Sequence, residues 1–327
     1  MVDTMLSKRV VLRRNFSEYA FENKMTEEQR HACVSRTVAA VDALDDTYYL
    51  YQPSDIDAQK FSKLHDKGLL SRRFRDNAGA ALMIRNDDRL SIQINGADHL
   101  LFTLADADGL SEGIHALESL AADLFPGGTY AYDNQFGYLT ARPFHAGSGA
   151  QACCVLHLPM LSVMQELKAL SRTLLKENRV VLEPFNDLKD KNPGDMYLLY
   201  NAGGLDSADN ITERIDAALQ RVGQKEGSLR DFFLCNSRSA YGDQIFRALG
   251  ILRYARRMNY KEFLSLWSKV RLGVQVGLID LDEGLVDRLY TQAQDSHLQA
   301  ERGDQPDSHA ISYLRADTIR KHLSGGL

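Results

Sequence analysis

The sequence predicts an α+β fold, in which antiparallel strands and groups of helices occupy separate stretches of the chain. Hydrophobic residues recur with the helical period of 3.6 near residue 34 and with the strand period of 2 after about residue 77. Two alternating stretches flank Asn86-Asp87-Asp88, a tripeptide typical of a hairpin turn. The last third of the chain has a mainly helical pattern, and strands segregated from helices are typical of the α+β class.

A helix is the first element that we expect. Thr26 and Gln29 have the spacing of a capping box, and Val34, Val38 and Val41 recur along one helical face. The helix should therefore begin at Thr26.

Residues 55–76 follow as a charged helix and connector. Their basic residues are Lys60, Lys63, Lys67, Arg72, Arg73 and Arg75. A charged stretch of this kind is the best candidate for a domain boundary. The sequence thus predicts a small, mainly helical N-terminal domain over residues 1–76 and a larger domain over residues 77–327.

The larger domain should begin with the hairpin, whose strands span residues 80–85 and 89–95. Leu90, Ile92 and Ile94 share one face of the second strand. The later elements are expected in this order: a helix over 111–124, strands near 137–141 and 152–156, a helix over 160–176, strands near 180–182 and 195–200, and helices near 207–224, 228–255, 260–270, 282–295 and 308–322.

Composition excludes several classes of protein. The 327 residues include 39 Lys and Arg against 44 Asp and Glu, a net charge of −5, so a nucleic-acid partner is not expected. Apolar runs stay well short of the roughly 20 residues of a membrane span, and the N-terminal stretch lacks the apolar core of a secretory signal. We therefore expect a cytoplasmic protein that does not bind membranes.

Cysteine and glycine spacing gives no cofactor motif. Cys33, Cys153, Cys154 and Cys235 form no C-x-x-C pair, and no H-E-x-x-H occurs, so a metal site is not expected. Gly147-Ser148-Gly149 and Gly203-Gly204 match neither nucleotide-binding glycine motif and are better explained as tight turns.

Seven segments, taken in order, carry a family resemblance. They are Arg14-Asn15-Phe16 with Tyr19-Ala20-Phe21, residues 94–100 (INGADHL), residues 136–140 (FGYLT), Pro143 with Gly147-Ser148-Gly149, His157-Leu158-Pro159, residues 247–252 (RALGIL) and residues 270–273 (VRLG). Their order and nearly ungapped spacing resemble the ATP:guanidino phosphotransferases, and most closely the bacterial protein arginine kinases. The resemblance covers nearly the whole chain.

The resemblance implies a small α-helical domain and a guanidino-kinase-like domain, in which helices flank an antiparallel sheet. It also implies transfer of the γ-phosphoryl group of Mg-ATP to a guanidinium group. Three tools are implied for that chemistry: arginines that clamp the phosphates, carboxylates that hold and deprotonate the guanidinium, and a cysteine beside it.

Most of the implied phosphate clamp is missing from this sequence. Arg9 matches one clamp arginine. The other four positions hold Val11, Leu101, Gln151 and Glu183. Gly68 stands where the resemblance implies a histidine that contacts the nucleotide. The pocket should therefore change from cationic toward neutral or acidic.

The implied acceptor side is altered as well. Gly96 and Ala97 replace the paired glutamates, and Arg142 replaces the reactive cysteine. Cys153 and Cys154 lie in an expected strand interior and substitute for that cysteine poorly.

The resemblance also implies a second site, a phosphoarginine reader with the motif E-R-D-x-x-R-A. Arg315-Ala316 keep its end, but Ala310, Ile311 and Ser312 stand at its charged part. Residues 301–304 (ERGD) could be a shifted version. We otherwise expect the reader to be lost.

Three functions remain open. The first is a pseudokinase of this family that acts by binding a protein: an adaptor, a partner kinase, a client or a second copy of itself. Association with the family suggests protein quality control. In this interpretation Arg9, His99, Arg247 and Arg271 make solvated or intramolecular hydrogen bonds.

The second is an active Mg-ATP-dependent phosphotransferase with a rebuilt site. Replacement charge would come from Arg9, Arg13, Arg14 and Arg142, and a base from Asp98 or Glu183. The third is a different small-molecule site on the same scaffold.

Overall fold

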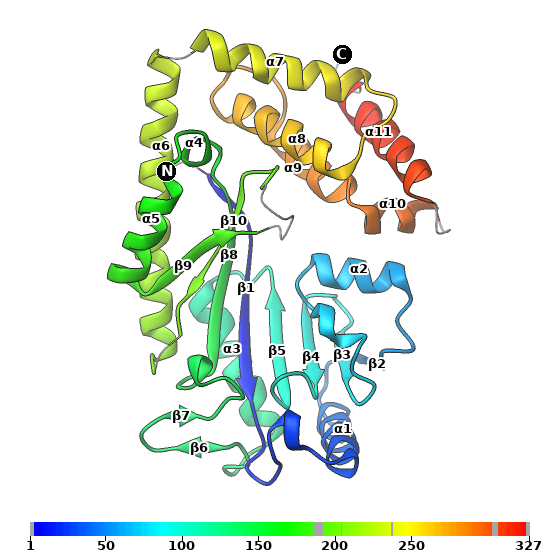
Figure 1. The fold of residues 1–327 in the computed structure, drawn as a ribbon. Helices are drawn as coiled ribbons and strands as arrows, with labels where there is room; N and C mark the ends of the chain where they lie inside the picture. The colour runs from blue at the N-terminus through cyan, green and yellow to red at the C-terminus, as the bar shows by residue number, and fades with distance from the viewer. Residues whose placement is uncertain (1–2, 186–191, 204, 237, 303–306, 325–327) are drawn as a thin grey trace.

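An eight-stranded antiparallel sheet, in the order β2-β3-β4-β5-β1-β8-β10-β9, is the largest element of the fold (Figure 1). The computed structural model describes residues 3–185, 192–203, 205–236, 238–302 and 307–324. The strands of the sheet are β1 (Met5–Arg14), β2 (Tyr48–Tyr51), β3 (Ala81–Arg85), β4 (Leu90–Ile94), β5 (Leu100–Ala105), β8 (Ala150–His157), β9 (Val180–Pro184) and β10 (Met196–Asn201). The α+β class is confirmed.

The first strand of the chain, β1, lies inside the sheet between β5 and β8. It was not expected from the sequence, because its charged residues hide the alternation of a strand. Val10 and Leu12 are fully buried on one face, whereas Arg9, Val11 and Arg13 alternate with them on the other. With β2 at the edge, residues 1–76 contribute two strands to the sheet, which therefore continues across the predicted boundary at residue 76.

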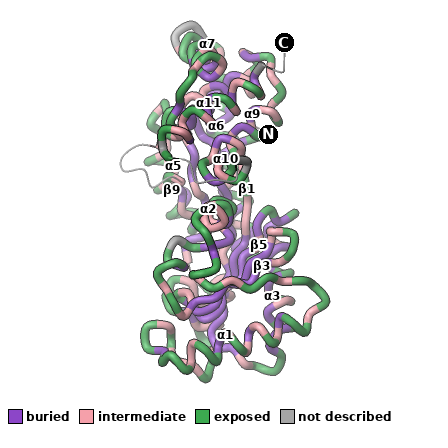
Figure 2. The backbone as a smooth tube through the Cα atoms, turned by 90° about the vertical axis from the view of Figure 1, so that its right-hand side faces the viewer, coloured by how far each residue is buried: buried purple, intermediate pink, exposed green. Residues whose placement is uncertain are grey.

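Helices pack against one face of the sheet. They are α1 (Glu27–Val41), α3 (Leu110–Leu124) and the first half of α6 (Ala208–Asn236). The capping box of α1 is confirmed: the Gln29 N–H donates to Thr26 Oγ1 at 3.2 Å, and the Thr26 N–H donates to Gln29 Oε1 at 3.1 Å. Buried residues on Figure 2 concentrate between these helices and the strands.

The opposite face of the sheet is covered near its β2 edge and, at one end, by the C-terminal helices. It is open between these two places. Toward β2 and β3, α2 (Ala58–Asp66) and a 3₁₀ turn, η2 (Arg72–Phe74), bury Leu64, Leu70 and Phe74 against Leu82 and Ile84. The strands β1, β5 and β8 are left uncovered by this layer, which positions a cleft over the middle of the sheet.

The C-terminal helices form a second layer at one end of the sheet (Figure 1). They are α7 (Arg238–Tyr254), α8 (Tyr260–Gln275), α9 (Glu283–Gln292), α10 (Asp295–Arg302) and α11 (Ser308–Ser324), packed around a core that contains Trp267. The Ser296 hydroxyl on α10 donates to Asp66 of α2 at 2.6 Å, so this layer reaches the edge of the cleft. No helix in the described part of the chain has the length and apolarity needed to cross a bilayer.

Two helix predictions need correction. The helix expected over residues 160–176 is divided into α4 (Pro159–Val163), α5 (Leu167–Thr173) and a π turn, η4 (Leu174–Asn178), because Gln165 adopts φ +58° between the first two. The break expected at residues 225–227 is absent. Glu226 is buried there and its carboxylate accepts from the Met160 and Leu161 N–H groups at 3.1 and 2.9 Å, which ties the continuous α6 to the first turn of α4.

The short turns behave as the sequence predicts. β3 and β4 form the expected hairpin, with Asp88 at φ +53° in its turn. Gly147 and Gly149 have φ +107° and +70°, close to the small hairpin of β6 (Tyr132–Asp133) and β7 (Gly137–Tyr138). Residue 204 lies outside the described residues.

Candidate functional site

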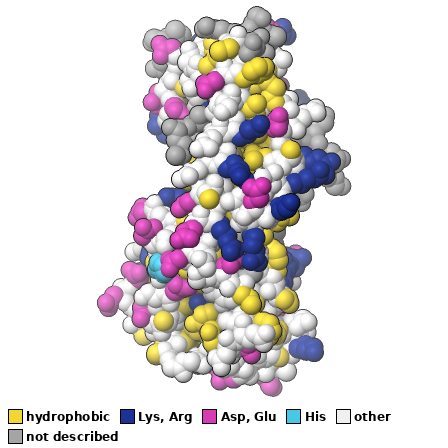
Figure 3. All heavy atoms as spheres, turned by 90° about the vertical axis from the view of Figure 1, so that its left-hand side faces the viewer, with side chains coloured by type: hydrophobic (Ala, Val, Ile, Leu, Met, Phe, Trp, Pro, Cys, Tyr) yellow, Lys and Arg dark blue, Asp and Glu magenta, His cyan; other side chains and the backbone are white. Residues whose placement is uncertain are grey.

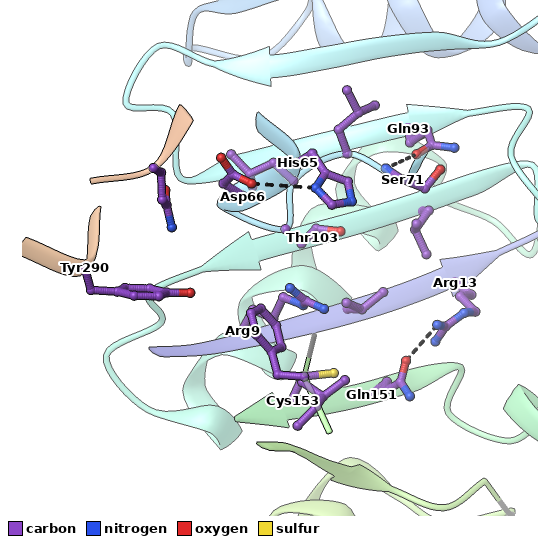
Figure 4. Close-up of a pocket in the computed structure, with 18 of the residues that line it drawn as sticks. Arg9, Arg13, His65, Asp66, Ser71, Gln93, Thr103, Gln151, Cys153 and Tyr290 are labelled. Atoms are coloured by element: carbon purple, nitrogen blue, oxygen red, sulfur yellow. Dashed lines mark hydrogen bonds and ion pairs between the residues drawn. The ribbon is translucent and has the colours of Figure 1, made fainter. Parts of the chain in front are cut away.

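A cleft of about 740 Å³ lies over the centre of the sheet, where β1, β5 and β8 run side by side (Figure 4). The strands contribute alternate residues to it, because successive side chains point to opposite faces. Arg9, Val11 and Arg13 come from β1, Leu101 and Thr103 from β5, and Gln151 and Cys153 from β8. Its size is within the usual range of small-molecule sites.

The register of the sheet brings the predicted clamp positions together. Val11 of β1 lies opposite Gln151 of β8 and Thr103 of β5, and Arg13 lies opposite Leu101. Arg9, Val11, Leu101, Gln151 and Gly68 all line the cleft. These five positions therefore lie together in space, and Arg9 is the only charged residue among them.

Arg9 occupies the space beside Gly68. A Cβ atom built on Gly68 would lie 2.9 Å from Arg9 Cζ, and the Gly68 backbone has φ +74°. Among the described residues no carboxylate lies within 4.0 Å of the Arg9 guanidinium. The absence of a side chain at position 68 thus permits the observed conformation of Arg9.

Arg13 is the second guanidinium of the cleft, and its side chain is only 12% exposed. Its Nη2 donates to Gln151 Oε1 at 2.8 Å, whereas Nε lies 3.9 Å from Asp98 Oδ2. Burial lowers the pKa of Arg13, but an arginine keeps its charge in proteins. Nη1 is buried and has no hydrogen-bond partner in the described part of the chain.

Cys153 lies beside both arginines but is a poor replacement for a reactive cysteine. Burial raises the pKa of its thiol, and the attraction of Arg9 and Arg13 opposes that rise. Since the thiolate is the reactive form, a buried thiol with a raised pKa is inert.

The three altered acceptor positions lie at the margin of the cleft. Gly96, Ala97 and Arg142 do not line the cavity. A Cβ on Gly96 would lie 2.7 Å from Gln93 Nε2, and Gln93 does line it. Arg142 is exposed, just before a short 3₁₀ turn, η3 (Pro143–His145). Burial, and after it the charge of Arg13, lowers the pKa of His145 to about 4.

Asp98 and His99 are structural. Asp98 Oδ1 accepts from Asn15 Nδ2 at 2.8 Å and from the Ala141 N–H at 2.7 Å. His99 Nδ1 accepts from the Phe16 N–H at 3.0 Å, so Nε2 donates to the Ala20 carbonyl at 2.8 Å. Burial lowers the pKa of His99 and favours this neutral ring. Asp98 is therefore committed to the loop and is badly placed to act as a base.

Glu183 lies outside the cavity. It is an exposed residue of the edge strand β9, opposite Leu198 of β10, and accepts from the Tyr200 hydroxyl at 3.3 Å. The negative charge that Glu183 was expected to bring into the pocket therefore lies beside the cleft and not inside it.

Arg14, Arg247 and Arg271 do not line the cleft. Arg14 stacks on Tyr138 with its Cζ 3.5 Å from the ring centroid, and Arg271 is buried with its Nε 2.7 Å from Asp287 Oδ1. Arg247 is exposed and lies 4.0 Å from Asp243. The expected intramolecular role is confirmed for Arg271.

The positions of the implied phosphoarginine reader are used for packing. Ile311 is buried, and the Ser312 carbonyl accepts from the Met258 N–H at 3.0 Å. Arg315 is buried as well and donates to the carbonyls of Ala293 and Met258 at 2.7 and 3.0 Å. In the alternative motif, residues 303 and 304 lie outside the described residues.

Sequence reasoning missed several residues of the cleft. Tyr290 of α9 and Gln294, just before α10, close it from the C-terminal layer, and Ser71 and Thr103 add hydroxyls. Arg13, in contrast, was named from the sequence as possible replacement charge, and it lies four residues from Arg9 on the same strand face. Asp66 is the one carboxylate among the described lining residues, and it lies 3.8 Å from His65 and accepts from Ser296.

The chemistry of the described cleft is that of anion binding. Two guanidinium groups face it, and Gln93 and Gln151 add amides. No group of three metal-binding side chains occurs in the described residues.

Comparisons with known proteins identify the class. The model of the ATP:guanido phosphotransferase C-terminal catalytic domain matches residues 29–226, and that of the protein-arginine kinase McsB C-terminal domain matches residues 238–325. The chain therefore belongs to the ATP:guanido phosphotransferase family, as its motifs predict.

Within that family, the chain is similar to protein-arginine kinases. It is 29% identical to the protein-arginine kinase of Caldanaerobacter subterraneus subsp. tengcongensis, over 98% of this chain and 97% of the relative. It is 28% identical to that of Clostridium botulinum, over 98% of this chain and 96% of the relative.

Solved structures support the fold alone. Lombricine kinase superposes with a TM-score of 0.60 at 17% identity, over 71% of this chain and 68% of that chain. The duplicated taurocyamine kinase of Schistosoma mansoni superposes with a TM-score of 0.61 at 18% identity, over 76% of this chain and 37% of that chain.

Proposed function

We propose that this protein is a pseudokinase of the family, which keeps the kinase fold and acts by binding another protein. The observation that carries the proposal is the composition of the cleft. Val11, Leu101 and Gln151 line it where the family motifs imply phosphate-binding arginines. An apolar or neutral side chain cannot offset the charge of a triphosphate.

The expected loss of rate is large. One positioned arginine contributes about 10³ to 10⁵ in phosphoryl transfer, and a general base about 10² to 10⁴. These factors are not additive. Even so, Arg9 is the one arginine that the cleft keeps at the positions that the motifs imply, and Gly96 and Ala97 replace the two glutamates.

Exposed hydrophobic side chains support a role in protein binding. Figure 3 shows hydrophobic side chains gathered on the upper, helical part of one face. The exposed large hydrophobic residues of α6, α7 and α11 are Phe232, Phe246, Ile251, Tyr254 and Tyr313. Contiguous apolar patches mark interaction sites, and the hydrophobic side chains gathered in Figure 3 make this face the candidate surface. The partner would be an adaptor, a partner kinase, a client or a second copy, and the process would be protein quality control.

Calorimetry with Mg-ATP, beside a phosphoarginine assay on a generic protein substrate, tests the proposal. We expect no micromolar binding and no transfer of the γ-phosphoryl group. The triple variant Val11→Arg, Leu101→Arg, Gln151→Arg provides a matched gain-of-binding arm, in which affinity for Mg-ATP should rise at least tenfold. Micromolar binding and transfer by the unaltered chain would overturn the proposal.

The alternative is an active Mg-ATP-dependent phosphotransferase on protein arginine with a rebuilt site. The position of Arg13 favours it, because Arg9 and Arg13 together give the cleft two guanidinium groups. If transfer occurs and Arg13→Gln abolishes it, the alternative replaces the first proposal.

A further inference from the structure

One end of the cleft is lined by Arg13, Gln93 and Gln151, and it has an unused hydrogen-bond donor for an anion. Arg13 Nη1 is buried without a hydrogen-bond partner among the described residues, although Nη2 is bonded to Gln151. A buried charged donor that is left unpaired costs free energy, and a bound acceptor would recover it. This orphaned donor belongs to a side chain that lines the cavity.

Asp98 forms an ion pair with Arg13 but no hydrogen bond to it. Its Oδ1 atom is engaged by Asn15 and by the Ala141 backbone, and its Oδ2 atom lies 3.9 Å from Arg13 Nε, beyond hydrogen-bond distance. Asp98 therefore offsets part of the charge of Arg13 and leaves its Nη1 donor open to a ligand.

Neighbouring groups also favour an anion. Gln151 accepts from Arg13 through Oε1, which leaves its Nε2 group as a donor, and Gln93 accepts the Ser71 N–H through Oε1 at 3.4 Å. Gly96 and Ala97 bring no carboxylate to this end. Arg142 lies outside the cleft, and its positive charge is the last of several causes that act on the pKa of Arg13 and of His145.

The rest of the cleft suits an apolar body of small size. Leu70, Leu101 and Tyr290 line it together with Val11, and its volume of about 740 Å³ fits a small molecule. Arg9 lies four residues along the same strand face, where it could pair with a second anionic group.

We propose that this end of the cleft binds a small molecule through an oxyanion, a carboxylate or a phosphate monoester, held by Arg13 and Gln151. A guanidinium group, the acceptor implied by the family motifs, would meet like charge there and is excluded. The inference rests on the proposed function, because it assigns an occupant to the cleft of a protein that transfers no phosphate.

Titration calorimetry of the full chain tests the inference with four probes: phenyl phosphate, phenylacetate, inorganic phosphate and methylguanidinium. At least one of the three anions should bind with submillimolar affinity, and methylguanidinium should not bind. Phenyl phosphate against phenylacetate distinguishes the two oxyanions. The affinity for inorganic phosphate, compared with that for phenyl phosphate, shows how much the apolar part of the ligand contributes to binding.

Two variants localise the binding. Arg13→Gln should weaken the best anion at least tenfold, and Arg13→Lys should restore part of the loss because it keeps the charge. Arg85→Gln is the matched control, since Arg85 lies on β3 of the same sheet, outside the cleft, and pairs with Asp87 at 2.7 Å. It removes the same charge and should change the affinity less than twofold. Thermal unfolding checks that each variant is folded.

The outcomes separate this inference from the proposed function. If no anion binds at 10 mM, or if Arg13→Gln and Arg85→Gln weaken binding equally, the inference is wrong and the pseudokinase proposal stands. If Mg-ATP binds tightly and its phosphoryl group is transferred, the pseudokinase proposal is wrong. Anion binding that depends on Arg13, without any transfer, supports both.

Discussion

The guanidinium of Arg9 lies in the space that a side chain at position 68 would need. The two residues belong to different elements: Arg9 to the central strand and Gly68 to the turn that follows α2. The absence of a side chain at Gly68 and the conformation of Arg9 therefore depend on each other, because both concern the same space.

Substitution of Gly68 should cost more than its backbone conformation alone. We expect Gly68→Ala to lower the free energy of unfolding by about 1–3 kcal/mol, because a positive φ is strained for alanine and the end of the flexible Arg9 side chain must also move. Gly127→Ala is the matched control, because Gly127 has φ +87° and no atom lies within 4 Å of its added Cβ. It should cost about 1 kcal/mol. Urea unfolding measures both, and equal costs would mean that Arg9 moves aside freely.

Glu226 should be one of the buried positions at which a substitution lowers the stability of the fold most. Its fully buried carboxylate accepts from the two N–H groups at the start of α4 and pairs with Arg230 at 3.0 Å. Glu226→Ala leaves that buried arginine unpaired, so we expect a loss of about 3–5 kcal/mol in urea unfolding. Glu213→Ala, at an exposed position on the same helix, should stay within about 0.5 kcal/mol. A loss below about 1 kcal/mol at Glu226 would contradict the role assigned to it.

Stability should fall as the pH drops below about 6.5, in part because of His157. The Nδ1 atom of His157 accepts from Arg271 Nη1 at 3.3 Å, and the Nε2 atom of His157 donates to Ser268 Oγ at 2.8 Å. The Ser268 hydroxyl in turn donates to Asp195 at 2.6 Å. Protonation of Nδ1 would place a proton against the Arg271 donor. Burial, reinforced by Arg271, therefore lowers the pKa of His157 well below its ordinary value.

The sign of this effect follows from proton binding. Between the lowered pKa and about 6.5 the unfolded chain binds the proton and the folded chain does not, so stability rises with pH. His157→Gln should reduce the slope by up to about 1.4 kcal/mol per pH unit between pH 6.5 and 5.5. His31→Gln, on an exposed side chain of α1, is the control. Identical slopes for wild type and His157→Gln would refute the assignment.

Native thiol labelling should single out Cys235. Burial raises the pKa of Cys33 and of Cys154 to about 12 and also raises that of Cys153, whereas Cys235 is exposed on α6. At pH 8 we expect iodoacetamide to modify one thiol per chain, and Cys235→Ser to remove nearly all labelling. Mass spectrometry identifies the site. Rapid labelling of Cys153 would show that a reactive cysteine persists in the cleft.

The sequence predicted those elements whose signal is local. The capping box at Thr26 and Gln29 is present, and the hairpin of β3 and β4 forms around the expected turn. β1 escaped prediction because one of its faces lines the cleft, so polar and charged side chains interrupt its apolar pattern. Helix α6 continues past its expected end because a buried contact of Glu226, distant in sequence, holds it.

The site was predictable only as far as its motifs. Arg9, Val11, Leu101, Gln151 and Gly68 meet in one cleft, as the motifs imply. Tyr290 and Gln294 could not be assigned to it, because they come from a layer whose docking depends on tertiary contacts such as that between Ser296 and Asp66. Glu183 stands at a position that the motifs assign to the phosphate clamp, but it lies at the edge of the sheet, where its side chain is solvated.

The central place of β1 also determines the order of assembly. This strand is synthesised before its neighbours β5 and β8, which end only at Ala105 and His157. The middle of the sheet must therefore wait for about half of the chain, which makes its closure a slow, non-local step. A deletion within the first 14 residues would leave β5 and β8 without the strand that joins them and would divide the sheet at its centre, instead of shortening one end of the molecule.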